Sequence, residues 1–400
     1  MIYFPSPHAD IPRYLVIPSV GIGGVERRFI DIFSALVKRG ERVKLILHPM
    51  TVAQLREQGE SLRIPFMTFG SSTDSLQRFV RNYARWLLRQ RNTVASFHYT
   101  QNCLAPAHAF MPHWVTTSLV ESMTSPKLTL KNKTARHFWV SMKSADRIDV
   151  LNPSVFQLTC DRFPDLRDRV SLTPGGTYVD VDTFLIGNKQ PQIALLSRMI
   201  PDRKGIEDWL EVLPEVAALM HGRSPRNLEF LIAGRGPLEN FVEESVKRLK
   251  SEGVPIRTAF RESPREILAR AQVALSLQRF NNYPSRVVAE ARLSGCATVV
   301  RDNGESRNFG EPVGMRYVRD SLDPDELAET LVELLTLHDI PEFGSSIRLN
   351  AVSQFGGQDV PDYFSRLMTP PSGDLRSPFK SGDMTEARRS RFIPLLVAYL

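Results

Sequence analysis

The feature that constrains the fold most is a strand, a glycine turn, a helix and a second strand within residues 14–48. The helix is indicated by apolar residues that recur at helical spacing after the glycines: Phe29, Ile32, Phe33, Leu36 and Val37. Gly40 ends this helix, and the apolar segment 43–47 follows almost at once. Because a strand, helix, strand unit joins neighbouring strands in parallel, the sequence predicts an α/β domain with a parallel sheet.

The same pattern recurs along the rest of the chain. The first half continues with the strand-like segments TVASFHY, WVTTSLV, ADRIDVLN and RVSLTPGG. After the polar turn FLIGNKQP, the pattern restarts with IALLS, LEFLIAG, the weaker IRTAF and VALSL. We therefore expect two Rossmann-like domains, residues 1–185 and 190–345, that face each other across a ligand-binding cleft. A terminal helix at 346–368, which could cross back to the first domain, and a flexible tail at 369–400 complete this prediction.

Composition excludes several classes of protein. With 42% hydrophobic and 24% charged residues, the chain is typical of a globular enzyme or binding protein. No apolar run is long enough to span a membrane and no secretion signal is visible, so we expect a cytoplasmic protein. The three cysteines, Cys103, Cys160 and Cys296, lie too far apart to indicate a disulfide framework or a zinc site. The net charge of +7 favours anionic partners, but no nucleic-acid-binding motif is present.

The glycine turn GIGG at residues 21–24 lies between a strand and a helix. Glycines there let backbone amides approach a ligand, and a helix N-terminus favours anions, although a simple tight turn explains the motif as well. A dinucleotide-binding fingerprint would need a third glycine where Glu26 stands. It would also need an acid at the end of the next strand, where the chain has Leu47 and His48. The sequence therefore argues against a nicotinamide-dependent dehydrogenase.

Two segments of the second half carry residues suited to a phosphate. Arg198 and Lys204, in SRMIPDRKG, follow the first strand of the second domain, where two cations could neutralise a leaving diphosphate. The turn AGRGPL places Gly234 between a strand and a helix.

The segment NNYPSRVVAEARLSG predicts a helix that begins near Ser285 and Arg286, and its free amides would favour a phosphate. Glu290 lies about one turn deeper and could accept hydrogen bonds from ribose hydroxyls. The turn DNGES at residues 302–306 could line the same site.

From about Tyr14 to about Phe309, the order and spacing of these segments resemble the two-domain GT-B glycosyltransferases of the family 4 type. The resemblance is carried by GGVERRFIDIFSALVKRGERV, ADRIDVLN, TPGGTYVDVDTF, SRMIPDRKG, LIAGRGPLE and NYPSRVVAEARLSGCATVVRDNGES. It implies transfer of a sugar from a nucleotide diphosphate donor to a glycan or lipid-linked acceptor. It also implies retention of configuration, no metal or other cofactor, and a role in envelope or extracellular polysaccharide synthesis.

The resemblance also assigns site residues. It implies that Arg198 and Lys204 are catalytic and hold the donor diphosphate, while Glu290 holds the ribose. The remaining donor-binding candidates are Gly23, Gly24, Gly234, Asn282, Ser285 and Arg286.

Two positions depart from the family pattern. A second acid is usual eight positions before the ribose glutamate, where this chain has Asn282, and a histidine is usual near Val120, where none is present. His98 and Glu121 are candidates for a sugar or acceptor contact, although His98 could equally be a structural histidine. Because of these departures, an alternative interpretation stays open: the chain is an inactive homologue that binds a nucleotide-sugar or a partner enzyme. A sugar-nucleotide epimerase is a further alternative.

Two other features lie outside this site. Asp180 and Asp182 match a DxD metal motif, but they fall in the loop that closes the first domain, so we expect no metal there. Residues 76–91 predict an amphipathic helix with a basic face that includes Arg81, Arg85 and Arg89. Such a helix either packs on its own sheet with its arginines in water or lies on an anionic membrane surface. The second alternative predicts peripheral attachment at the inner face of a membrane.

Overall fold

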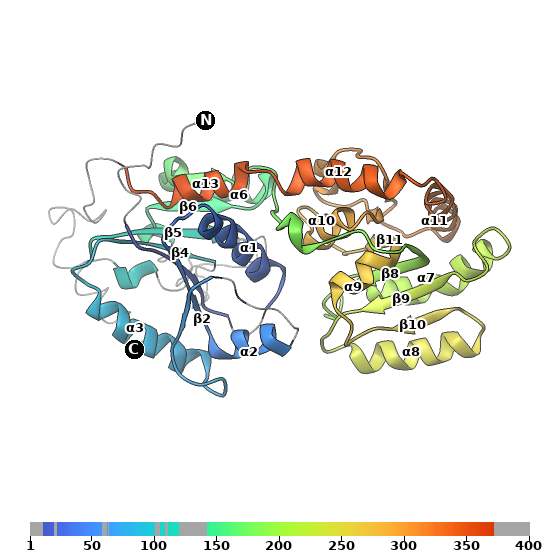
Figure 1. Cartoon of the computed structure of the whole chain (residues 1–400), viewed down its shortest axis with the longest axis horizontal. Coiled ribbons are helices and arrows are strands. Elements are labelled where there is room, and N and C mark those ends of the chain that lie inside the picture. Colours follow the sequence, from blue (N-terminus) through green and yellow to red (C-terminus); the bar gives the residue numbers. More distant parts are fainter. Residues whose placement is uncertain are drawn as a thin grey trace. The chain divides into compact units, whose positions relative to one another are not determined.

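The computed structural model describes residues 11–19, 22–57, 62, 64–100, 105–108, 111–119 and 142–371. The chain forms two compact units (Figure 1). The first contains the residues up to Pro174 together with those from Gln358 onward, and the second contains Gly175–Gly357. The predicted tail lies outside the described residues from 372 onward.

The first unit is built on a seven-stranded sheet in the order β3-β2-β1-β4-β5-β6-β7, with every pair parallel. Its strands are β1 (Arg13–Ile17), β2 (Val43–Leu47), β3 (Phe66–Thr68), β4 (Ala95–Tyr99), β5 (His113–Leu119), β6 (Arg147–Val150) and β7 (Val170–Leu172). The strand order reverses between β1 and β4, and such a switch point is where open α/β sheets bind ligands.

Helices cover this sheet because alternate residues of each strand face opposite sides. The described helices of the unit are α1 (Gly24–Lys38), α2 (Pro49–Glu57), α3 (Leu76–Arg89), η1 (Ala105–His108), α6 (Pro153–Arg162), η2 (Pro164–Arg169) and α13 (Asp359–Leu367). In β4, Phe97 packs in one cluster with Tyr83 of α3, whereas His98 contacts Phe29 of α1 and Phe364 of α13. The last described helix, α13, therefore packs beside α1 in the first unit (Figure 1).

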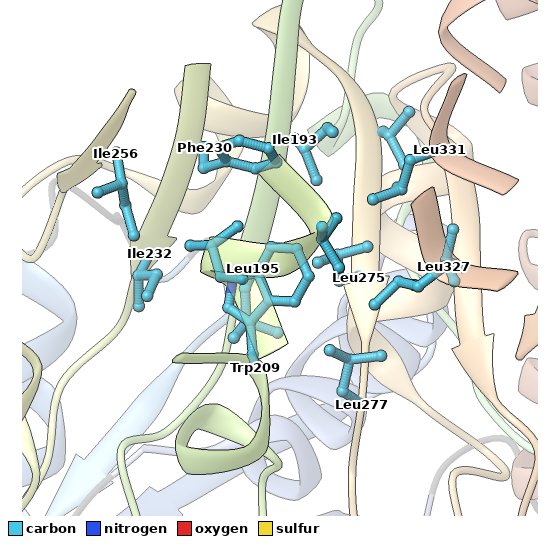
Figure 2. Packing of buried hydrophobic residues seen from close by; sticks show 14 of the residues in the cluster. Ile193, Leu195, Trp209, Phe230, Ile232, Ile256, Leu275, Leu277, Leu327 and Leu331 are labelled. Carbon is cyan, nitrogen blue, oxygen red and sulfur yellow. The ribbon is translucent and has the colours of Figure 1, made fainter. Parts of the chain in front are cut away.

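The second unit has a six-stranded parallel sheet in the order β10-β9-β8-β11-β12-β13. Its strands are β8 (Gln190–Leu196), β9 (Glu229–Ala233), β10 (Ile256–Thr258), β11 (Ala271–Ser276), β12 (Ala297–Arg301) and β13 (Met315–Val318). Both faces are buried: Ile193 and Leu195 of β8 enter one core, and Ala194 and Leu196 enter the other. In the first core, Trp209 lies among branched side chains from the strands and from α11 (Pro324–Leu337) (Figure 2).

The remaining helices of the second unit are η3 (Val181–Thr183), α7 (Ile206–Met220), α8 (Glu239–Ser251), α9 (Pro264–Arg270), α10 (Arg286–Leu293), η4 (Ser306–Phe309) and α12 (Phe343–Phe355). The expected two-domain α/β class is confirmed. The units divide at Pro174 and Gly175, earlier than the predicted boundary, because Val179 and Phe184 are buried in the second core. The predicted terminal helix is two helices, α12 and α13, and the chain passes from the second unit to the first after Gly357.

Among the described residues, no helix is both long enough and apolar enough to cross a membrane.

Candidate functional site

The second sheet has its switch point between β8 and β11, where the strand order reverses. At this edge of the sheet, two glycines let neighbouring loops pack closely against each other. A Cβ on Gly234 would lie 1.8 Å from Ser197 O, and one on Gly205 would lie 1.9 Å from Leu277 O. Both glycines have positive φ angles, so no other residue fits without displacing a neighbouring strand end. The loops after β8, β9 and β11 are therefore held side by side, and they carry Arg198, Lys204 and Gln278.

Arg198 and Lys204 form the cationic part of this edge. Arg198 is exposed, and none of the described residues pairs with its guanidinium. Lys204 is half-buried, and its pKa is lowered to about 8, mainly by burial and further by the charges of Arg198 and Arg203. Two like charges held close together repel each other, and an anion bound between them relieves this repulsion. This edge is therefore suited to a phosphate-bearing ligand.

The carboxylates of the same edge are already paired with other arginines. Asp208 accepts hydrogen bonds from both Arg279 and Arg301, each at 2.5 Å at its shortest, and these bonds lower the pKa of Asp208. Asp302 pairs with Arg307 at 2.6 Å. These ion pairs order the loops after β11 and β12 without neutralising Lys204.

Helix α10 begins where the sequence predicts. Ser285 is its N-cap residue, but its hydroxyl lies 3.3 Å from Ser276 Oγ and does not cap the helix. Glu290 is 7% exposed and accepts a hydrogen bond of 2.5 Å from Nε of Arg286, one turn earlier. In this arrangement the Glu290 carboxylate is engaged by a cation of its own helix, and a ribose hydroxyl would have to share it.

Asn282 is buried, and it is 1% exposed. Its Oδ1 accepts from Ser276 Oγ at 2.9 Å and from Gln278 Nε2 at 3.0 Å. Its Nδ2 donates to Ser276 O at 3.1 Å and to Arg301 O at 3.2 Å. These four bonds use the full capacity of an amide, so no group is left for a sugar hydroxyl. A carboxylate at this position could not donate to the two carbonyls.

At the first sheet, Gly23 and Gly24 begin helix α1. The amide of Gly23 donates to Glu26 Oε2 at 2.8 Å, and Glu26 is buried. The carboxylate therefore takes a backbone donor that a phosphate-binding turn would offer to its ligand.

His98 lies inside the first unit and is fully buried. Its Nε2 is 3.1 Å from Ser118 Oγ, and its Nδ1 is 2.8 Å from Thr116 Oγ1. Ser118 donates its hydroxyl hydrogen to Asp149 at 2.6 Å, so it accepts from Nε2–H of His98. Burial, together with the charge of Arg28, lowers the pKa of His98 to about 3. The ring is therefore neutral, with both nitrogens engaged in the interior, as expected of a structural histidine.

Ser118, His98 and Asp149 have the residue types of a hydrolase triad but not its order. In such a triad the imidazole lies in the middle and is hydrogen-bonded to both the carboxylate and the hydroxyl. Here the Ser118 hydroxyl lies in the middle, between His98 and Asp149. Asp149 also accepts hydrogen bonds from Thr173 and, at 2.9 Å, from Tyr363. The cluster is thus a buried polar network that ties α13 to the sheet.

Two predicted features remain, the segment around Glu121 and the DxD motif of Asp180 and Asp182. Glu121 and the position near Val120 lie outside the described residues. Asp180 caps the short helix η3 by accepting from the amide of Asp182 at 3.2 Å, so this DxD motif forms a local turn.

Sequence reasoning missed Gln278, whose Oε1 accepts a hydrogen bond from Lys204. A lone glutamine after a strand carries no motif. Its only signal was its place just beyond the carboxyl end of a predicted central strand.

Comparison with known proteins agrees with this architecture. Residues 190–337 match the family described as glycosyl transferases group 1. No curated protein sequence matches the chain.

The fold is similar to that of several solved glycosyltransferases. HepE from Anabaena, solved with UDP and glucose, has a TM-score of 0.63 and 15% identity, over 89% of this chain and 98% of that one. A TarM variant from S. aureus, solved with UDP, fondaparinux and α-GlcNAc-glycerol, gives 0.69 and 9%, over 90% and 100%. WaaG, described as a glycosyltransferase involved in lipopolysaccharide biosynthesis, gives 0.61 and 14%, over 90% and 100%.

At such low identities the structural likeness establishes the fold alone, whereas the family match concerns the part of the chain that carries Arg198, Lys204 and Glu290. The second unit therefore carries a glycosyl transferases group 1 segment, and the chain as a whole has the GT-B fold of glycosyltransferases.

Proposed function

We propose that this protein is a retaining glycosyltransferase that moves a sugar from a nucleotide diphosphate donor to a glycan or lipid-linked acceptor without a metal or other cofactor. The observation that carries the proposal is the pair Arg198 and Lys204 at the switch point of the second sheet. These two cations lie close enough for Arg198 to lower the pKa of Lys204, while the nearby carboxylates pair with other arginines. A departing diphosphate would supply the missing negative charge.

In this proposal the chain stabilises the leaving group and needs no protein nucleophile. Arg198 and Lys204 bind the diphosphate oxygens, and the amides at the N-terminus of α10 add a favourable dipole. Gly234 is a further donor-binding candidate, because it lets the loop after β9 pack against Ser197 in the loop that carries Arg198 and Lys204. Glu290, held by Arg286, is the candidate for the ribose hydroxyls.

The proposal is tested with a panel of UDP-, GDP- and ADP-sugars, assayed for hydrolysis without acceptor and for transfer to envelope glycans. Nucleotide binding is followed by thermal shift. We expect one nucleotide to stabilise the protein and its sugar to be hydrolysed slowly. Tight nucleotide binding with complete inertness toward every donor would favour the inactive homologue, and a new sugar-nucleotide formed without acceptor would favour an epimerase.

We further propose that the acceptor is met at an anionic membrane surface on the cytoplasmic side, through helix α3. The inner face of α3 is buried, whereas Arg81, Arg85 and Arg89 are exposed at intervals of one turn. None of the described residues pairs with these three arginines, and residues 75–100 contain no Asp or Glu. Leu88, on the same side, is 46% exposed. A cationic face with an exposed leucine favours a lipid surface over a purely ionic partner.

This second proposal is tested by co-sedimentation with phosphatidylcholine vesicles that contain or lack phosphatidylglycerol. Each basic residue near an anionic surface contributes about 1 kcal/mol, so the triple change Arg81→Glu, Arg85→Glu, Arg89→Glu should weaken binding at least about a hundredfold. The matched control changes Lys247, Arg248 and Lys250 of α8 to Glu and should bind like the native protein. Binding that ignores lipid charge would contradict the proposal.

A further inference from the structure

Lys204 is held by an uncharged partner. Among the residues that the structure describes, Gln278 is its only hydrogen-bond partner, through Oε1. An amide oxygen orients an ammonium group but brings no negative charge. The backbone supports the same contact, because the amide of Arg279 donates to Arg203 O at 3.1 Å and joins the loop of Lys204 to that of Gln278.

Gln278 is itself fixed at both ends. Its side-chain Nε2 donates to Asn282 Oδ1 at 3.0 Å, and its backbone carbonyl accepts from Asn303 Nδ2 at 2.6 Å. Asn282 cannot turn away, since its other three bonds go to Ser276 and to the carbonyl of Arg301. A continuous chain of amides thus runs from two strand ends, β11 and β12, to the ammonium group of Lys204.

We propose that Gln278 is a positioning residue that aims Lys204 at the donor phosphates, and that Asn282 serves this purpose by orienting Gln278. The inference rests on the proposed function and deepens it. It gives Asn282 a task that an acidic residue could not perform, because a carboxylate in its place would face the carbonyl oxygens of Ser276 and Arg301 with no hydrogen to donate.

The neutral partner matters because it leaves the charge of Lys204 available. A carboxylate in place of Gln278 would form an ion pair with Lys204 and compete with the donor diphosphate. Among the described residues, Arg198 and Arg203 repel the ammonium charge and Gln278 accepts a hydrogen bond from it. Replacing Gln278 should therefore shift the titration of Lys204 in a direction set by the replacement.

The first experiment measures that titration without any assay of activity. Competitive acetylation of the full-length protein over a range of pH, followed by mass spectrometry, gives the protonation midpoint of Lys204. The native midpoint is expected near pH 8. Gln278→Glu should raise it, because a carboxylate favours the charged amine, and Gln278→Leu should lower it, because a bond to the charged form is lost. Gln278→Met replaces the leucine variant if that variant does not fold.

Gln272→Leu, at the opposite end of strand β11, is the matched control and should leave the midpoint unchanged. Equal midpoints in native protein, Gln278→Glu and Gln278→Leu would overturn the positioning role, whether or not the protein transfers sugar. If the midpoints shift as expected but the protein transfers no sugar, Gln278 does position Lys204. Only the proposal that this serves donor binding would then be refuted.

The second experiment uses the donor identified by the panel. Gln278→Glu should raise the KM for the donor about tenfold, because its carboxylate competes with the diphosphate for Lys204 and a charge-assisted bond contributes about 1.5 kcal/mol or more. Asn282→Asp should raise the KM in the same direction, because a carboxylate cannot donate to the carbonyls of Ser276 and Arg301 and so no longer orients Gln278. The alkaline limb of kcat/KM should move up in Gln278→Glu and down in Gln278→Leu, because protonated Lys204 is the active form. A variant that lost activity with an unmoved pH profile would show that Gln278 supports the fold only.

Discussion

The two units place polar groups at the carboxyl ends of their sheets in opposite ways. In the first unit, His98, Ser118 and Asp149 are buried and bond one another. In the second, Arg198 is exposed and Lys204 meets only an amide among the described residues. Polar groups that satisfy each other hold a fold together, whereas charges left uncompensated are available to a ligand. Substitutions at these positions should therefore affect mainly stability in the first unit and mainly activity in the second.

The largest effect is expected from Asp149→Leu in the first unit. This change removes the carboxylate that accepts from the hydroxyls of Ser118, Thr173 and Tyr363 and that lies 4.0 Å from Arg28. The free energy of unfolding should fall by about 3–5 kcal/mol, measured by urea denaturation. Asp168→Leu, an exposed control, should change it by less than about 0.5 kcal/mol. Equal stability of the two variants would remove the contrast between the units.

Lys204→Ala tests the second unit. Loss of one group that stabilises developing charge should lower kcat/KM about 100-fold to 1,000-fold, in a steady-state assay with the best donor. The same variant should unfold within about 1 kcal/mol of the native protein. Lys247→Ala, on the exposed face of α8, is the control and should keep full activity. A Lys204→Ala enzyme with most of its activity would contradict the assignment of the diphosphate site.

The pH dependence of stability sharpens the comparison. The pKa of His98 is about 3 in the folded protein and about 6.5 in an unfolded chain, so the unfolded chain takes up the proton first. The contribution of His98 to stability is present above pH 6.5 and is lost as the pH falls toward 3. At pH 5.5 the native protein should have lost about 1.4 kcal/mol through this residue. His98→Gln should lose correspondingly less between pH 7 and 5.5 in urea titrations, and identical slopes would be inconsistent with a buried neutral ring.

The smallest effect is expected from Tyr363→Phe, which removes one hydroxyl from the network. Its bond to Asp149 should contribute about 1 kcal/mol to stability. In the Asp149→Leu background the same change should cost much less, because only the longer contact of 3.4 Å to Ser171 O remains. A double-mutant cycle measures this coupling, and additive effects would mean that the hydroxyl acts elsewhere.

The fold could be predicted from sequence because long strands in parallel sheets read as continuous apolar runs, such as the segment Ile193–Leu196 within β8. The edge strands β3 and β13 escaped prediction because FMT and MRYV are too short to show a period. The helix start at Arg286 was predictable from the proline and serine before it.

Contacts that depend on pairing between strands were not predictable. Ser118 lies opposite Asp149, and His98 lies opposite Thr116, only because of the register of β5 with its neighbours. No local pattern encodes that register, so His98 could be either a ligand contact or a structural residue on sequence grounds. For the same reason Asn282 could not be distinguished from a sugar-binding amide until its four partners were known.

The packing of α13 beside α1 has a consequence for how the chain matures during translation. The first unit would begin to emerge from the ribosome early, yet Phe364 and Tyr363, which complete its interior, are made only after the whole second unit. The apolar surface around Phe29 on the nascent first unit therefore stays exposed until α13 has been synthesised. We expect ribosome-bound chains that stop near residue 357 to recruit chaperones and to be cut readily by proteases, and chains extended beyond Leu367 to resist both.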